Sequence, residues 1–196
     1  MMLDGYTDVP PGKIAAVVTY LEMRAPPALP SAPPPPDFRV RRVLQPDLDW
    51  YRALYRAVGE NWLWFSRLRL SNAELREIIH HPQVDVFALA HDRHDIGLLE
   101  FDRRQFPDIE MAFFGITPAW IGRGAGRALL QHCLPLAWET GPQRLWLHTC
   151  TSDHPGALRF YTKAGFGPYK RAIEVADDPR VSGQLPRSAA PHLPIL

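Results

Sequence analysis

Hydrophobic and polar residues follow two different periods along this chain, and together they predict a mixed α/β fold. Alternation of apolar and polar positions indicates strands, whereas apolar residues three or four positions apart indicate helices. From residue 38 onward the elements follow the order strand, two helices, three strands, helix, strand, helix, strand. The strands are predicted at 14–23, 38–44, 84–90, 96–101, 109–116, 145–150 and 169–175, and the helices at 47–58, 71–80, 126–140 and 155–164.

The distribution of proline divides the chain into four expected parts. Residues 25–37 are rich in proline. This composition excludes a helix or a central strand there and predicts an extended linker. A proline-rich ligand for a partner domain is the alternative use of this segment. We expect a strand-containing N-terminal arm at 1–24, a globular domain at 38–176 and an irregular C-terminal tail at 177–196. The N-terminal strand docks either elsewhere on the sheet or on a second subunit, which leaves a homodimer with strand exchange open.

Composition narrows the function classes. The 196 residues carry a formal net charge of +1, so no field for nucleic acid is evident. The two cysteines, Cys133 and Cys150, lie in apolar surroundings and fit reduced core thiols. Neither an apolar run of transmembrane length nor a signal-peptide layout is present. We therefore expect a cytoplasmic protein with no nucleic-acid or membrane partner. The histidines show no repeated metal-ligand spacing, so no metal is expected.

Three glycines at alternate positions, Gly122, Gly124 and Gly126, connect an apolar strand to an alanine- and leucine-rich helix. Such a turn collects unpaired backbone N–H groups at the positive end of the helix dipole, where phosphate binds. A dinucleotide fingerprint is excluded because Arg127 and Leu129 stand where its last glycine is needed. A P-loop is excluded because no Lys-Ser or Lys-Thr pair follows the last glycine.

The glycine spacing resembles the pyrophosphate loop of the GCN5-related N-acetyltransferase (GNAT) superfamily, Gln/Arg-x-x-Gly-x-Gly/Ala. Gly124 and Gly126 match its two glycine positions, whereas Ile121 replaces the usual Gln or Arg. The resemblance implies that acetyl-CoA is the acyl donor and that backbone amides hold its pyrophosphate. It also implies that the strand before the loop contributes to the donor site. The implied donor contacts are Phe114, Ile116, Ile121, Gly122, Arg123, Gly124, Ala125, Gly126 and Arg127.

A second segment, residues 154–166, is similar to the later motif of the same family, Asn-x-x-Ala-x-x-Phe-Tyr-x-x-x-Gly-Phe. All positions of the motif agree except the first, where His154 replaces Asn. The offsets place His154, Ala157 and Tyr161 on one helix face. The resemblance implies that Ala157 lets the pantetheine arm lie close and that His154 contacts a pantetheine amide or acts as an acid–base group. Tyr161 is the implied general acid for the departing thiolate.

The strand at 109–116 supplies the other half of the implied chemistry. In the family this strand carries a bulge that opens a gap for the thioester, and a backbone amide, here that of Phe114, polarises the acetyl carbonyl. Glu110 stands where some members keep a catalytic glutamate. Because an amine must lose a proton before it attacks, Glu110 is a candidate base. A solvated or substrate-binding carboxylate, with water as the base, is the alternative.

Residues 60–67 lie between the first two helices, the region that covers the acceptor side in the family. Trp62 and Trp64 are candidates for an aromatic wall of the acceptor pocket, with Phe65 beside them, although core packing is the alternative. Arg67 either holds an acceptor carboxylate or forms a surface ion pair. The sequence does not identify the acceptor.

The resemblance covers about residues 38–175 and predicts a GNAT fold. This fold is a twisted, mostly antiparallel sheet of six or seven strands, splayed at the acyl-CoA site and flanked by about four helices. The predicted activity is transfer of an acetyl group from acetyl-CoA to a primary amine of a small molecule or peptide, by direct attack in a ternary complex. A non-catalytic module that binds CoA as a sensor or interaction partner is the alternative, because Ile121 and His154 depart from the family motifs.

Overall fold

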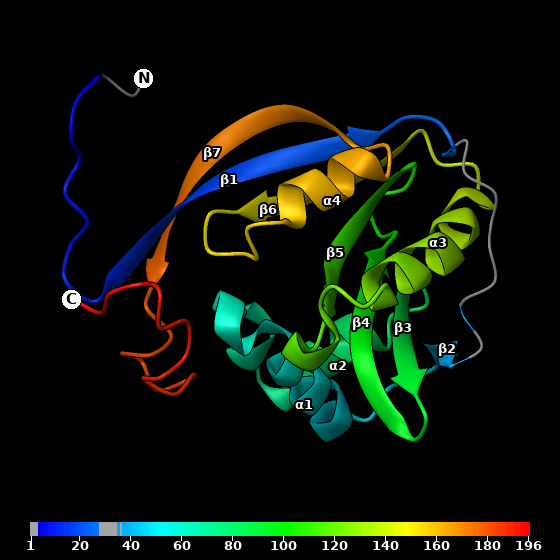
Figure 1. Cartoon of the computed structure of the whole chain (residues 1–196), viewed down its shortest axis with the longest axis horizontal. Coiled ribbons are helices and arrows are strands. Elements are labelled where there is room, and N and C mark those ends of the chain that lie inside the picture. The colour runs from blue at the N-terminus through cyan, green and yellow to red at the C-terminus, as the bar shows by residue number, and fades with distance from the viewer. Residues whose placement is uncertain (1–3, 28–34, 36) are drawn as a thin grey trace.

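The computed structural model describes residues 4–27, 35 and 37–196 and shows one seven-stranded sheet with the order β2-β3-β4-β5-β6-β1-β7 (Figure 1). Most of the expected linker, residues 28–34 and 36, lies outside the described residues. The element order predicted from residue 38 onward is confirmed. The strands are β1 (Lys13–Met23), β2 (Phe38–Val43), β3 (Val84–His91), β4 (His94–Asp102), β5 (Asp108–Ile116), β6 (Arg144–Cys150) and β7 (Gly167–Asp177). The helices are α1 (Leu48–Gly59), α2 (Asn72–Ile79), α3 (Ala125–Trp138) and α4 (Ala157–Lys163), with short 3-10 turns at Glu60–Trp62, Ser66–Leu68 and Pro118–Trp120.

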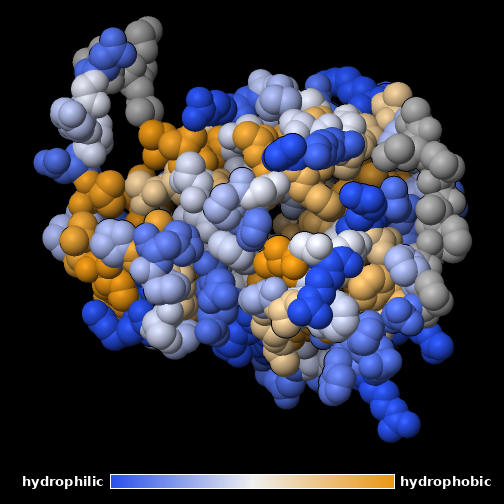
Figure 2. Space-filling view, in the orientation of Figure 1, coloured by the Kyte–Doolittle hydropathy of each residue, from blue (hydrophilic) through white to orange (hydrophobic). Residues whose placement is uncertain are grey.

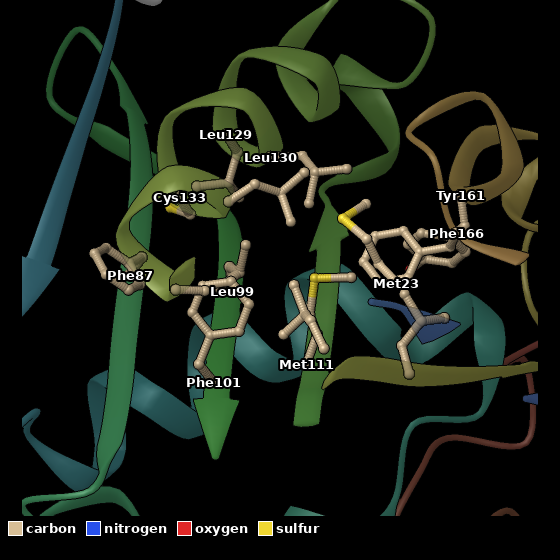
Figure 3. Packing of buried hydrophobic residues seen from close by; sticks show 14 of the residues in the cluster. Met23, Phe87, Leu99, Phe101, Met111, Leu129, Leu130, Cys133, Tyr161 and Phe166 are labelled. Atoms are coloured by element: carbon tan, nitrogen blue, oxygen red, sulfur yellow. The ribbon is translucent and has the colours of Figure 1, made fainter. Parts of the chain in front are cut away.

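Two hydrophobic layers hold the helices on opposite faces of the sheet. Side chains alternate between the faces of a strand, so β3 and β4 contribute to both layers. Leu99 and Phe101 pack under α3 together with Leu129, as Figure 3 shows. Val86 and Leu98 point to the other face, where α1 and α2 cover them. Met23 of β1, Tyr161 of α4 and Phe166 extend the first layer toward α4.

The N-terminal strand docks on the sheet of its own chain, between β6 and β7. It pairs antiparallel with both neighbours, for example Val18 with Cys150 of β6 and Ala16 with Glu174 of β7. Leu21 and Met23 at its far end are buried in the core. Of the two expected locations, the one on the sheet is confirmed. The strands before and after the linker therefore form one continuous sheet.

The sheet opens between β5 and β6, as the predicted splay requires. The two strands are parallel and pair only from Asp108 with Arg144 to Glu110 with Trp146. On its other side β5 has one extra residue, Ala112, opposite the Glu100–Phe101 step of β4. A bulge of this kind bends the strand and increases its twist. The predicted bulge in this strand is therefore present, and beyond Glu110 a gap separates β5 from β6.

The C-terminal segment after Asp177 contains no helix or strand among its described residues, and it folds around one arginine. Arg180 forms an ion pair with Asp178 at 2.7 Å, and both side chains are almost completely buried. Arg180 also donates to the backbone carbonyl of Leu193 at 2.8 Å. The segment packs through Leu185, Ala189 and Ala190 against Leu63, which lies between Trp62 and Trp64.

Candidate active site

A pocket of about 870 Å³ occupies the gap between β5 and β6. Figure 2 shows the hollow near the centre of the molecular face, between α4 and the loop that precedes α3. Residues from every part of the predicted site line this pocket. They are Trp62, Trp64, Arg67, Glu110, Phe114, Ile116, Ile121, Gly122, Gly124, Gly126, Arg127, His154, Ala157 and Tyr161.

Two predicted donor contacts, Arg123 and Ala125, are not part of the lining. The guanidinium of Arg123 lies 5.4 Å from the centre of the Trp120 ring, and the side chain of Ala125 is fully buried in the core. Their side chains therefore do not contribute to the pocket wall. Sequence spacing identifies residues near a loop but does not show which of their side chains face inward.

The glycine loop leaves a group of backbone donors without partners. Gly122 and Gly124 have φ angles of 80° and 83°, a region that L-residues with side chains rarely adopt. Gly124 precedes α3, and no side chain caps this helix. Within the described residues, the N–H groups of Ala125, Gly126 and Arg127 donate to no other group. With the helix dipole behind them, these donors form a site for an anion such as a phosphate.

Tyr161 projects from α4 into the first hydrophobic layer and also reaches the pocket. Its ring packs edge-on against Phe114 at 6.0 Å and Phe166 at 6.3 Å. Burial, and secondly the charge of Asp153, raise the pKa of Tyr161 well above the usual tyrosine range. The hydroxyl has no hydrogen-bond partner among the described residues. Tyr161 therefore keeps its proton at neutral pH and has a free donor at the pocket.

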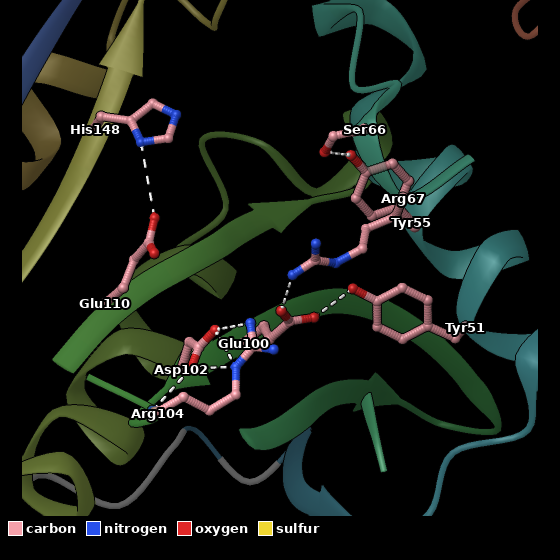
Figure 4. Close-up of polar contacts among 9 residues, drawn as sticks. All are labelled: Tyr51, Tyr55, Ser66, Arg67, Glu100, Asp102, Arg104, Glu110 and His148. Atoms are coloured by element: carbon pink, nitrogen blue, oxygen red, sulfur yellow. Dashed lines mark hydrogen bonds and ion pairs between the residues drawn. The ribbon is translucent and has the colours of Figure 1, made fainter. Parts of the chain in front are cut away.

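Glu110 is the last residue of β5 that pairs with β6, where the gap opens (Figure 4). Its carboxylate faces His148, with Oε1 4.0 Å from Nδ1 of the imidazole. Burial raises the pKa of Glu110 to about 7, and the negative charge of Asp102 adds to this shift while Arg67 opposes it. A carboxyl group with this pKa exchanges a proton readily at neutral pH, which suits a general base.

Arg67 forms an internal ion pair, not the surface pair that was one of its two predicted roles. It donates to Glu100 at 2.5 Å, and Tyr51 donates to the other carboxylate oxygen at 2.5 Å. Glu100 is fully buried and only 13% of the Arg67 side chain is exposed. The guanidinium also lies 4.8 Å from the centre of the Phe113 ring. Glu100 thus neutralises the positive charge that Arg67 brings to the pocket wall.

The aromatic residues after α1 line the pocket, and one of them is also part of the core. Trp64 packs against Tyr55 and Phe113 with ring centroids 5.3 Å apart in both pairs. Trp62 lies edge-on to His154 at 5.2 Å. The two alternatives raised for Trp64, core packing and a pocket wall, therefore coexist in one side chain.

Asp153 is a lining residue that sequence reasoning missed. Its carboxylate accepts hydrogen bonds from the Thr149 hydroxyl at 2.7 Å, the Cys150 amide at 2.8 Å and Nε1 of Trp64 at 3.4 Å. These contacts connect the end of β6 to the aromatic wall. Asp153 directly precedes the second motif, but no local pattern marks it, because Trp64 comes from a distant part of the chain.

The cysteines and the metal-binding residue types give no separate site. Cys133 is buried in the core, whereas Cys150 lines the pocket. Burial, and secondly the charge of Asp153, raise the pKa of Cys150 to about 11, so its thiol stays protonated. The described part of the chain has no group of three or more His, Cys, Asp or Glu side chains arranged to hold a metal ion. Nor does it have a helix of the length and apolarity that a membrane span requires.

Comparison with known sequences adds independent information. The sequence profile described as "Acetyltransferase (GNAT) family" matches residues 48–166. Uncharacterised N-acetyltransferases of Mycobacterium bovis and Mycobacterium tuberculosis are 30% identical to this chain over 102 residues. That alignment covers 52% of this chain and 65% of the relative, so less than two thirds of the length of these proteins is matched.

Solved structures share the fold at low sequence identity. A GCN5-related N-acetyltransferase from Sphaerobacter thermophilus superposes with a TM-score of 0.55 at 22% identity, covering 86% of this chain and 53% of that one. The ribosomal-protein-S18-alanine N-acetyltransferase from Escherichia coli gives 0.56 at 15% identity, covering 72% and 94%. An aminoglycoside acetyltransferase from an uncultured soil sample gives 0.55 at 17% identity, covering 66% and 88%. At these identities the likeness is one of fold.

Proposed function

The chain belongs to the acetyltransferase (GNAT) family, and on that premise we propose that it transfers an acetyl group from acetyl-CoA to a primary amine. The observation that carries this proposal is the opening between β5 and β6. It places a free tyrosine hydroxyl, a carboxyl group with a pKa near neutrality and a set of unpaired backbone donors around one pocket.

The donor binds, in this proposal, with its pyrophosphate at the N-terminus of α3. The unpaired N–H groups of Ala125, Gly126 and Arg127 supply hydrogen bonds that do not depend on a side chain. This explains how the loop functions with Ile121 in the place of Gln or Arg, because the main chain supplies the donors. The Arg127 side chain adds positive charge in the first turn of the helix.

The acyl transfer is a direct displacement within the gap. The amine nitrogen attacks the thioester carbon, the new C–N bond forms and the C–S bond breaks. The backbone amide of Phe114 is proposed to stabilise the oxyanion that develops on the carbonyl oxygen. The proton of the attacking amine goes to Glu110, directly or through water, and Tyr161 donates its proton to the departing thiolate. The cycle closes when the tyrosinate takes up a proton from water and Glu110 releases its own. No covalent enzyme intermediate is needed, and the neutral thiol of Cys150 is a poor nucleophile.

Thiol release from acetyl-CoA tests the proposal. The purified full chain is incubated with acetyl-CoA and a panel of amines, and free CoA thiol is measured alongside the acetylated amine. We expect release that depends on both enzyme and amine, with one acetylated amine formed per thiol. If acetyl-CoA binds in a calorimetric titration but no amine is acetylated, the alternative of a non-catalytic CoA-binding module replaces this proposal. If acetyl-CoA does not bind, both functions are wrong.

A further inference from the structure

The turn that follows α1 holds a leucine in a backbone conformation that normally requires glycine. The amide of Trp64 donates to the carbonyl of Gly59 at 3.0 Å. The amide of Leu63 donates to the carbonyl of Glu60 at 3.3 Å, which completes the hydrogen bonds of a Schellman motif. In this motif the left-handed position is usually occupied by glycine. Leu63 occupies it here with φ 53° and ψ 40°, which is unfavourable for a residue with a Cβ atom.

This turn places the aromatic wall of the pocket, which we define as Trp62 and Trp64. Leu63 separates the two tryptophans, and both of them line the pocket. The Trp64 ring packs against Phe113, whereas the Trp62 ring lies edge-on to His154 at 5.2 Å. A change of Leu63 to an ordinary backbone conformation would rotate the peptide groups on both of its sides and move both rings. The conformation of Leu63 therefore determines where the aromatic wall lies.

The C-terminal segment, residues 178–196, holds Leu63 in this conformation. The segment follows β7 and folds back beside the turn (Figure 1). Only 4% of Leu63 is exposed, and the other buried residues of its hydrophobic cluster, Leu185, Ala189 and Ala190, all belong to the segment. A strained backbone persists only where its surroundings fix it. Burial of the leucine side chain against the segment therefore offsets the unfavourable backbone angles.

Arg180 gives the C-terminal segment a defined shape. Its side chain is almost completely buried and forms the ion pair with Asp178. The same guanidinium donates to the backbone carbonyls of Ala189 and Ala190, both at 3.3 Å. These two alanines are residues that pack against Leu63. The buried arginine thus fixes the surface on which the leucine rests.

Two contacts outside the hydrophobic cluster connect the segment to the acceptor side. Arg69 donates to the side chain of Gln184 at 3.1 Å and to the backbone carbonyl of Asp177 at 2.8 Å. The ring of His192 lies 6.2 Å from the ring of Trp62. The C-terminal segment is therefore connected to the chain both before and after Leu63.

From these contacts, and resting on the function proposed above, we infer that the C-terminal segment determines acceptor specificity as a positioning element. It keeps Leu63 left-handed, and the turn then keeps Trp62 and Trp64 at the pocket. None of residues 178–196, all of which the structure describes, lines the pocket itself. An acceptor with an organic group that reaches the aromatic wall depends on the segment, whereas a very small amine does not.

Two primary amines that differ by a phenyl ring test this inference. The ring of 2-phenylethylamine reaches the aromatic wall, and ethylamine is too small to do so. We expect the wild type to have the higher kcat/KM with 2-phenylethylamine. Leu185→Ala should lower the ratio of the two kcat/KM values about three- to tenfold, because the turn then adopts its competent form only part of the time. The affinity for acetyl-CoA should not change.

Leu63→Gly provides the background that separates positioning from general stability. Glycine adopts the left-handed conformation readily, so the turn no longer depends on the segment. In this background Leu185→Ala should change the ratio by less than about twofold. Leu185→Met keeps most of the buried volume and should restore the ratio in the Leu63 background.

Leu75→Ala is the matched control for the loss of a buried leucine. Leu75 is fully buried in α2, and no residue of α2 lines the pocket. This variant should lose stability in thermal unfolding without a change in the ratio of the two kcat/KM values. An equal decrease of the ratio in Leu75→Ala and Leu185→Ala would show that general destabilisation is the cause, and it would overturn the inference.

Fluorine NMR tests the position of the wall without acetyl transfer. The protein is labelled with 5-fluorotryptophan, and the line of Trp62 is assigned with the variant Trp62→Phe. Leu185→Ala should shift or broaden this line and leave the line of Trp138, at the end of α3, unchanged. Arg69→Gln, which removes the contacts with Gln184 and Asp177 and leaves the core intact, should act in the same direction.

These measurements distinguish the inference from the proposed function. An unchanged Trp62 line in both folded variants, Leu185→Ala and Arg69→Gln, would overturn the inference. So would equal effects of Leu185→Ala in the Leu63 and Leu63→Gly backgrounds, or a wild-type preference for ethylamine. If no amine releases thiol from acetyl-CoA, the proposed function is wrong, and the Trp62 line alone decides whether the segment holds the wall.

Discussion

Tyr161 combines two properties that are usually separate, a core position and a free hydroxyl at the pocket. Its ring packs with Phe114 and Phe166. This packing buries the side chain, and the burial raises its pKa. Because Tyr161→Phe keeps this packing, we expect it to lower kcat about a hundredfold or more, the usual contribution of a general acid. The affinity for acetyl-CoA, measured calorimetrically, should stay near that of the wild type.

The matched control for this variant is Tyr169→Phe, which removes a hydroxyl from a half-exposed tyrosine of β7 outside the pocket lining. It should change neither kcat nor acetyl-CoA affinity. Equal turnover in the Tyr161→Phe variant and the wild type would remove Tyr161 from the mechanism.

Glu110 makes the pH profile a test of the base. With a pKa of about 7, the carboxylate form needed for proton removal builds up as the pH rises through neutrality. Wild-type kcat/KM divided by that of Glu110→Gln should therefore rise with a midpoint near pH 7, and the ratio cancels the titration of the amine itself. Five groups act on this carboxylate, namely Asp102, Arg67, Glu100, Arg104 and the facing His148.

His148 is the group most easily confused with Glu110, because its imidazole faces the carboxylate at 4.0 Å and an imidazole is also a common general base. His148→Gln should keep the rising limb of the profile. If His148→Gln abolishes the limb and Glu110→Gln retains it, the base is the imidazole and the assignment of Glu110 is wrong.

The same shift has a consequence for stability. The pKa of Glu110 is higher in the folded chain than its ordinary value of 4.5. Its favourable contribution to the free energy of unfolding is therefore fully present below pH 4.5 and is lost as the pH rises through 7. The melting temperature of Glu110→Gln relative to wild type should therefore increase from pH 5 to pH 8. A difference that is constant over this range would show that the carboxyl group is not perturbed in the folded protein.

At the scale of elements, the glycine loop depends on its backbone more than on any side chain. A Cβ at Gly124 would meet no atom within 4 Å, so space is not the constraint. The constraint is the φ angle of 83°, which costs an L-residue about 1–2 kcal/mol. Gly124→Ala should relieve this strain by shifting the loop, which moves the N–H groups at the start of α3 and weakens acetyl-CoA binding.

Gly141→Ala separates strain from function in this experiment. Gly141 also has a positive φ, 65°, and open space around it, but it lies in the turn after α3 and outside the pocket. Both variants should lose similar stability in thermal unfolding, and only Gly124→Ala should bind acetyl-CoA more weakly. Equal acetyl-CoA affinities in the two variants would contradict the placement of the pyrophosphate.

The elements themselves were predictable because each carries a local signal. Ser71 and Glu74, for instance, form the capping box at the start of α2, and they are only three positions apart in sequence. The bulge at Ala112 was predicted only through the family resemblance, since its cause is the mismatch with β4, a partner strand. Local patterns therefore predict where elements begin and end, whereas irregularities inside a strand depend on its neighbour.

At the scale of the whole molecule, β1 is the element that the sequence could not place. A strand joined to the domain by a long proline-dense segment can pair at several places in the sheet, so its own sequence pattern does not determine its neighbouring strands. Its insertion between β6 and β7 brings Glu174 of β7 to the pocket. Asp153 likewise joins the site through Trp64, which is distant in sequence. The residues of the two continuous motifs could be predicted to lie together, and they do line one pocket, whereas Asp153 and Trp64 meet there from distant segments.

A single cysteine substitution tests the placement of β1. Val18 pairs directly with Cys150, and paired residues of antiparallel strands have Cα atoms close enough for a disulfide. Val18→Cys should form an intrachain disulfide on mild oxidation, and the protein should run as a monomer on a non-reducing gel. Exchange of β1 between two subunits would give a covalent dimer instead. The double variant Val18→Cys with Cys150→Ser should form no such bond and serves as the control.

The most direct test of the central claim follows a labelled acetyl group from acetyl-CoA. The enzyme is mixed with the labelled donor and an amine that supports thiol release, the reaction is stopped within one turnover, and intact protein and small molecules are analysed by mass spectrometry. Direct attack in the gap between β5 and β6 predicts label on the amine and none on the protein. Label that first accumulates on the protein, for example on Cys150, or label that never leaves acetyl-CoA, would contradict the account.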